Sequence, residues 1–273
     1  RQPGASRVGE ALTYFASTTG KQRAIVAGPI VADSMRVAGE LKKQGYEVDV
    51  VTSGLEMKRT VAGSPDYELM FVAAGIQAPP LHLLIDPLRQ DGRSARIPLG
   101  ILARAYMLDR AEELAESDPY TLSFARPHNS ESVQWQVNQL LSLPDRDFLP
   151  RTERIRQAQA ALDWLIALCE HPSPAYPAIE FEETVLAALS VPELQDSALV
   201  LLGCLGTARA QRAAVEMAGR TALPIQQRVG AVSAFRRSVQ EYGVLLTTDE
   251  ILQQYDRYNA SESEDPGTQK IFS

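Results

Sequence analysis

The stretch YELMFVA, residues 67–73, decides the fold expected for the first half of the chain. Leu69 to Val72 form a continuous apolar run, which is typical of a strand buried on both faces of a parallel sheet. The run ends in Ala73-Ala74-Gly75, and a double proline closes the loop that follows. In an α/β protein, ligands bind at the carboxyl ends of such strands. At this end, no side chain can ionise, coordinate a metal or attack a substrate.

Short β-rich segments alternate with amphipathic stretches of helical periodicity on both sides of this strand. The alternation predicts right-handed βαβ units and therefore a five-stranded, parallel, doubly wound sheet of the flavodoxin-like α/β class over residues 21–144. The strands are expected at 23–28, 46–52, 67–73, 97–103 and 120–125. The helices are expected at 31–44, 54–63, 80–91, 104–117 and 130–142.

After a proline-containing linker at 142–153, every segment has a helical pattern. Helices are expected at 152–171, 180–190, 193–205, 208–220, 224–242 and 248–258. Pro192 overlays Pro224 in a weak repeat of 32 residues, which is typical of an α-solenoid, although two copies do not establish one. We expect an all-α, helical-repeat-like domain at 151–273 that ends near an exposed acidic loop at 261–267. A short helix within 1–20 is expected to be the end of an upstream domain.

The composition restricts the classes of partner. A net charge of −7 argues against a protein that holds nucleic acid or an anionic membrane, because both need a basic surface. No apolar run reaches the roughly 20 residues that span a bilayer, so no membrane span is expected. Cys169 and Cys204 are the two cysteines and form no CxxC motif, which excludes a disulfide framework and favours a reduced compartment, expected to be the cytoplasm. The first residue, Arg1, and the ending QKIFS suggest a piece of a longer protein.

The familiar nucleotide, metal and hydrolase motifs are missing from the sequence. After the first strand, Gly28 stands alone where a dinucleotide fingerprint needs GxGxxG. No segment matches a P-loop, and no GxSxG elbow occurs. His82, His128 and His171 are too scattered for a zinc site. We therefore expect no cofactor and no metal, and we interpret the three histidines as loop or surface residues.

The order and content of the segments resemble a receiver domain, the phosphoacceptor module of two-component response regulators. The resemblance covers residues 23–143 and rests on RAIVAG at 23–28, GYEVDVVTSG at 45–54, the IP pair that opens the fourth strand and the RP pair after the fifth. It implies the fold of that family and a phosphorylation site at the carboxyl ends of the strands. The second half resembles HEAT-type repeats, with AALDWLIAL and SALVLLGCLG as core segments.

The chemistry of the receiver family does not carry over to this chain. A receiver holds Mg²⁺ with an acidic pair after its first strand, where this chain has Gly28 and Pro29. The phosphoaccepting aspartate falls at Ala73, the hydroxyl residue at Ala103 and the lysine at Arg126. Without carboxylates there is no oxygen site for Mg²⁺, and alanine cannot accept a phosphoryl group. The resemblance therefore implies a degenerate pocket, a pseudo-receiver, and no enzymatic activity.

Two charged residues near this pocket leave alternatives open. Arg126 could bind an anion, or it could pair with an acid from a neighbouring element. Asp33 lies one turn into the first predicted helix of the domain, and Asp86 lies on the third. A single displaced carboxylate would replace neither the metal-binding pair nor the phosphoacceptor. Both acids are otherwise ordinary residues of a solvated helix face.

Two functions of different classes are consistent with these features. The first is a protein-interaction or scaffold module in bacterial signalling, because receivers bind partners through their fourth helix, fifth strand and fifth helix. Tyr106, Met107 and Trp135 are the candidate contacts on that face, unless they pack in the core of the protein itself. The alternative is binding of a small molecule, anion or nucleotide, or a residual enzymatic activity, in the crevice at the strand ends. No specific partner is indicated by the sequence.

Overall fold

The computed structural model describes residues 5–143, 149–171 and 176–260. Its contacts divide the chain into two compact units, Gly20–Arg154 and Arg1–Thr19 with Ile155–Ser273. The expected acidic loop at 261–267 and the centre of the expected linker lie outside the described residues. The two units are described separately below as the α/β unit and the helical unit.

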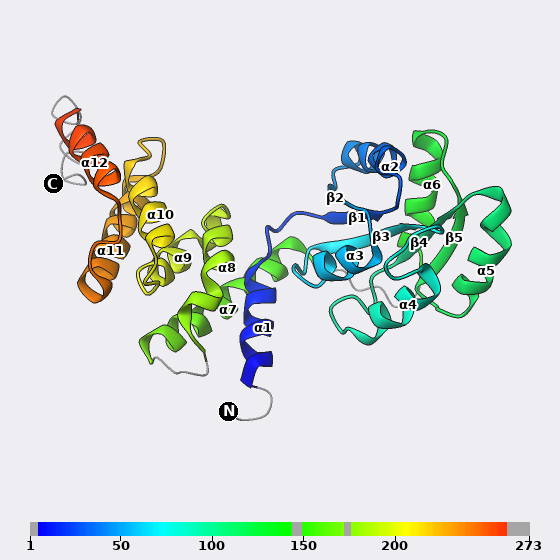
Figure 1. Cartoon of the computed structure of the whole chain (residues 1–273), viewed down its shortest axis with the longest axis horizontal. Coiled ribbons are helices and arrows are strands. Elements are labelled where there is room, and N and C mark those ends of the chain that lie inside the picture. Colours follow the sequence, from blue (N-terminus) through cyan, green and yellow to red (C-terminus); the bar gives the residue numbers. More distant parts are fainter. Residues whose placement is uncertain (1–4, 144–148, 172–175, 261–273) are drawn as a thin grey trace. The chain divides into compact units, whose positions relative to one another are not determined.

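The α/β unit contains one parallel sheet with the strand order β2-β1-β3-β4-β5 (Figure 1). Its strands are β1 (Arg23–Ala27), β2 (Glu47–Val51), β3 (Tyr67–Ala73), β4 (Leu99–Ala103) and β5 (Thr121–Ala125). Every residue of β3 is buried, as expected for the central strand of a doubly wound sheet. The predicted five-stranded, flavodoxin-like sheet is therefore confirmed.

Helices cover both faces of this sheet. They are α2 (Val31–Lys43), α3 (Gly54–Val61), α4 (Leu81–Gln90), α5 (Leu108–Glu116) and α6 (Ser130–Leu141). Apolar residues of α2 and α6 pack with Leu69 and Phe71 on one face. Those of α3, α4 and α5 pack with Met70 and Val72 on the other face. The alternation of side chains along a strand explains why neighbouring residues of β3 serve opposite cores.

Local capping fixes where several helices begin. Ser53 and Glu56 form a capping box at α3, and the Asn129 side chain accepts a hydrogen bond from the backbone of Ser132 at α6. The segment expected as one helix at 104–117 instead begins with a 3₁₀ turn, Ala105–Met107, before α5. Neither residue that precedes these elements, Arg104 or Met107, provides a capping side chain, so a tight turn satisfies the first backbone groups instead.

The helical unit is all-α, as predicted for the second half of the chain. The described helices that contribute to it are α1 (Ala5–Ala16), α7 (Arg151–Glu170), α8 (Glu182–Ala188), α9 (Gln195–Leu202), α10 (Ala208–Gly219), α11 (Ile225–Tyr242) and α12 (Thr248–Ala260). Leu162 and Leu165 are fully buried in its core, which matches the apolar stripe predicted for α7. α9 packs against α11, and these are the two helices that follow the overlaid prolines.

The N-terminal helix α1 packs within the helical unit and contacts α8. Ala16 is fully buried in the core of this unit, and Leu12 packs against that core. Segments from the two ends of the sequence therefore share one hydrophobic core. Throughout the part of the chain that the structure describes, every helix is too short or too polar to cross a bilayer.

Candidate functional site

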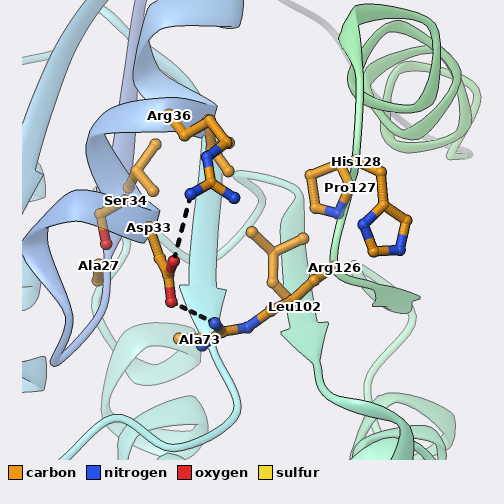
Figure 2. Close-up of a pocket in the computed structure, with 11 residues that line it drawn as sticks. Ala27, Asp33, Ser34, Arg36, Ala73, Leu102, Arg126, Pro127 and His128 are labelled. Carbon is orange, nitrogen blue, oxygen red and sulfur yellow. Dashed lines mark hydrogen bonds and ion pairs between the residues drawn. The ribbon is translucent and has the colours of Figure 1, made fainter.

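The carboxyl ends of the central strands border a small cavity of about 130 Å³. Its wall includes apolar atoms from β1, β3 and β4, one helical turn of α2 and the residues that follow β5. Figure 2 shows the polar residues that face it, which are Asp33, Ser34, Arg36, Arg126 and His128. This crevice is where ligands bind in open α/β sheets, so it is the candidate site of the α/β unit.

Gly28 and Ala73 lie next to each other at the edge of this crevice. A Cβ atom built on Gly28 would lie 3.2 Å from the Cβ of Ala73 and only 2.8 Å from the hydroxyl oxygen of Ser34. A carboxylate at position 28 would therefore displace the buried Ser34 side chain. Pro29, the next residue, is exposed. The two positions at which a receiver would hold Mg²⁺ thus provide neither a ligand nor, at Gly28, the room for one.

Ala103 and Arg126 lie at the ends of the adjacent strands β4 and β5. The backbone N–H of Arg126 donates a hydrogen bond to the carbonyl oxygen of Ala103 at 3.0 Å. The methyl group of Ala103 packs in the core on the face covered by α3, α4 and α5, and is 1% exposed. Ala103 therefore supplies packing, while the Arg126 side chain faces the cavity.

An ion pair between Arg126 and Asp33 crosses the crevice. Nη1 of Arg126 donates to Oδ2 of Asp33, which lies on α2, and the residues are 93 positions apart in the sequence. Arg36 approaches the other carboxylate oxygen at 4.0 Å, so Asp33 lies between two guanidinium groups (Figure 2). Of the two alternatives open for Arg126, the structure contains the pairing with a neighbouring acid.

Two further residues of the cavity were not singled out as site residues in the sequence. Ser34 is only 5% exposed, and its hydroxyl group has no hydrogen-bond partner among the described residues. His128 lies on the opposite side, directly after Pro127. Ser34 follows Asp33 on α2, so the one sequence signal for it was its position beside the acid. Its burial depends on the packing of α2 against the sheet.

The expected partner face lies at the β5 edge of the sheet. β5 is the last strand in the sheet order, and it is flanked by α5 and α6. Tyr106 is 78% exposed and Trp135 is 56% exposed, although the indole of Trp135 contacts the Phe124 ring edge-on at 5.8 Å between centroids. Met107 is half-buried and packs against the core of the unit. Two of the three candidate contact residues are thus available to a partner, and the third serves mainly the core.

Metal-binding groups do not gather anywhere in the described part of the chain. No cluster of three or more histidine, cysteine, aspartate or glutamate residues that could hold an ion occurs among the described residues. His82, His128 and His171 are all exposed. A search of protein-family models and a search of curated proteins found no match to the chain. The resemblance to receivers and to HEAT repeats therefore remains a prediction, whereas the flavodoxin-like sheet and the helical unit are established by the structure.

Proposed function

We propose that the α/β unit is a non-catalytic pseudo-receiver, and that the chain acts as a protein-interaction or scaffold module in bacterial signalling. The observation that carries this proposal is the Arg126–Asp33 ion pair across a crevice whose strand ends hold glycine and alanine. In this arrangement the cationic group that would stabilise a phosphoryl group is already paired with a carboxylate. No nucleophile stands at the end of β3.

The chemistry of phosphoryl transfer explains why this pocket would be inactive. The reaction depends on positioning and on metal ions that neutralise the developing charge. Mg²⁺ requires oxygen ligands in near-octahedral geometry. Asp33 is the one carboxylate that lines the cavity, and it is engaged by two arginines. A single paired carboxylate on a helix is a poor substitute for an acidic pair on a strand end.

The exposed aromatic residues beside β5 favour a role in binding another protein. Tyrosine and tryptophan are enriched in protein interfaces because they bury a large area at a low entropic cost. Trp135 is supported from below by Phe124, so its ring is positioned before any partner binds. An all-α unit of the helical-repeat type would provide a second binding surface on the same chain.

The pseudo-receiver proposal predicts that Ala73→Asp alone does not create a phosphorylation site. The new carboxylate would enter a crevice without a metal site and beside the guanidinium of Arg126. We expect no phosphoryl adduct by intact mass spectrometry after incubation with acetyl phosphate and Mg²⁺. We also expect no Mg²⁺-dependent rise in Tm with beryllofluoride. An active receiver treated in parallel is the control, and an adduct on the wild-type chain would refute the proposal.

The interaction proposal is tested by photo-crosslinking in the native host. A photoreactive amino acid at position 106 or 135 is expected to crosslink the same protein from both positions. The matched control is position 83, because Leu83 is also 56% exposed but lies on α4, on a different face of the unit. Equal crosslinking of this protein from position 83, or different products from 106 and 135, would contradict a partner face at β5.

A second candidate function is binding of a small oxyanion in the crevice. It is favoured by the unpartnered Ser34 hydroxyl and by the two arginines and one histidine on the cavity wall. Any such anion competes with Asp33 for Arg126, so binding to the wild type should be weak. Asp33→Asn is expected to give a rise in Tm of about 3–5 °C at a phosphate concentration tenfold above Kd.

The control for this experiment is the double variant Asp33→Asn, Arg126→Gln, which should lose the phosphate-dependent rise in Tm. If both variants respond to phosphate equally, the anion binds elsewhere and the crevice is not an anion site. Equal responses of the wild type and Asp33→Asn would show that Asp33 does not compete for the arginine.

A further inference from the structure

The two cysteines of the chain meet in the helical unit, although they are far apart in the sequence. Cys169 lies in the last turn of α7, and Cys204 lies two residues after the end of α9. Their thiols are hydrogen-bonded to each other. The Sγ of Cys204 also donates to the carbonyl oxygen of Val200 at 3.6 Å. The side chains thus form a short chain in which Cys169 donates to Cys204.

The segment around Cys204 is held tightly beneath α11. A Cβ atom on Gly203 would lie 3.1 Å from the carbonyl oxygen of Ala234, and one on Gly206 would lie 2.7 Å from the ring of Tyr242. The Tyr242 hydroxyl donates to the carbonyl oxygen of Cys204 at 3.0 Å. Cys204 is only 4% exposed, whereas Cys169 is half-buried. One thiol is therefore fixed and covered, and the other is open to solvent.

The charges around this pair favour a thiolate at the covered position. The hydrogen bond from Cys169, followed by the positive charge of Arg237, lowers the pKa of the Cys204 thiol, while burial, Glu241 and Glu170 oppose this effect. The same hydrogen bond, together with burial, raises the pKa of Cys169. A covered thiol that deprotonates readily beside an accessible thiol is the arrangement expected of a resolving and an attacking cysteine.

We propose that Cys169 and Cys204 are a redox-active dithiol that takes small-molecule disulfides as its oxidants. The Cys169 thiolate attacks one sulfur of the oxidant, so the oxidant's S–S bond breaks, a mixed disulfide forms and the first small thiol leaves. The Cys204 thiolate then attacks Sγ of Cys169 and releases the second small thiol. One protein disulfide has formed, one oxidant disulfide has been reduced, and the two thiol protons end on the two products.

The resulting disulfide would link the end of α7 to the turn after α9. These elements belong to the same unit, so the bond would restrict its unfolded chain and stabilise its folded state. The loop that it closes is of a length for which the chain-entropy model predicts a clear rise in Tm. We expect about 5–15 °C, reversed by dithiothreitol.

The experiment treats the full chain with oxidised glutathione and maps its peptides without reduction. The expected product is an intramolecular crosslink between the peptides that contain Cys169 and Cys204. Cys204→Ser should stop at a stable glutathione adduct on Cys169, because the second attack is lost. Cys169→Ser should remain largely unmodified, because Cys204 is covered. Circular dichroism checks that both variants keep the helical content of the wild type.

Two outcomes would overturn the proposal. One is a stable glutathione adduct on wild-type Cys169 with no crosslink, and the other is an intermolecular disulfide as the main product. Arg237→Gln provides a separate readout that does not remove a cysteine. It should leave the first step unchanged and slow the second, so that the mixed disulfide accumulates for several times longer than in the wild type. An unchanged second step would exclude Arg237 as a positioning residue.

Discussion

Replacement of Arg154 by alanine is expected to lower the free energy of unfolding of the α/β unit by about 3–5 kcal/mol. Arg154 is the last residue of this unit and lies in the first turn of α7. Its side chain is 5% exposed and contacts two acids that flank Tyr67 at the start of β3. Removal of a guanidinium from such a place leaves charge in the protein interior without its countercharge.

The geometry around Arg154 explains the size of this effect. Nη1 donates to Oε1 of Glu68 at 2.7 Å, while Nε lies 3.3 Å from Oδ1 of Asp66 but makes no hydrogen bond there. Oε2 of Glu68 accepts a further hydrogen bond from Gln22 at 2.9 Å. Asp66 is fully buried. Because water cannot replace the lost donor at this depth, the desolvation cost of the acids is no longer offset.

Urea denaturation measures the effect, with Trp135 as the reporter of the α/β unit in a Trp164→Phe background. Trp135 and Trp164 are the two tryptophans of the chain, and Trp164 is 66% exposed in the helical unit. The matched control is Arg110→Ala on α5, where the arginine is exposed and the loss should stay within about 0.5 kcal/mol. Equal losses for the two variants would show that Arg154 is not the buried countercharge of Asp66 and Glu68.

The strands and helices could be predicted from the sequence because each follows a simple pattern. Buried parallel strands are short apolar runs, and the surface helices between them carry an apolar stripe. The expected strand at 97–103 begins two residues late, at Leu99, and so leaves out Ile97 and Pro98. The pattern also hides long-range partners. The charged start of β3 resembles an ordinary solvated turn, and nothing in its sequence shows that Arg154 would cover it.

The candidate site was less predictable than the fold. The position of Ala73 at a strand end follows from local sequence, whereas the pairing of Arg126 with Asp33 depends on how α2 and β5 lie across the sheet. Sequence reasoning could state only that an acid of a neighbouring element was one of two partners. The contact between Cys169 and Cys204 also depends on tertiary packing, since their spacing matches no motif.

The second large effect is expected at Gly100, in the middle of β4. Gly100 is paired in register with Phe71 of β3, and the ring of Phe71 covers it on the face occupied by α2 and α6. A methyl group at position 100 would lie 2.8 Å from Cδ1 of Phe71 and 3.2 Å from Cδ1 of Leu140. Gly100→Ala is therefore expected to cost about 1–3 kcal/mol through overpacking.

Gly39→Ala is the matched control in the same unit. Gly39 lies inside α2, and a Cβ atom there would have no neighbour within 4 Å. Because alanine has a higher helix propensity than glycine, this variant should gain about 0.5–1 kcal/mol. The two glycine-to-alanine changes thus have opposite expected signs, and urea denaturation followed by Trp135 fluorescence distinguishes them. A stabilising Gly100→Ala would mean that the Phe71 ring does not define the space above β4.

The same geometry predicts that the sign of the change at Gly100 depends on Phe71. Phe71→Ala alone should cost about 3–5 kcal/mol, because it empties a fully buried ring position. In that background the space above Gly100 is open, so Gly100→Ala should become neutral or stabilising, and the coupling between the two changes should reach about 1–3 kcal/mol. Gly39→Ala should give the same gain in both backgrounds. If the cost of Gly100→Ala persists without the ring, the strain comes from the backbone of β4 or from Leu140, and the glycine would be required by the sheet itself rather than by its aromatic neighbour.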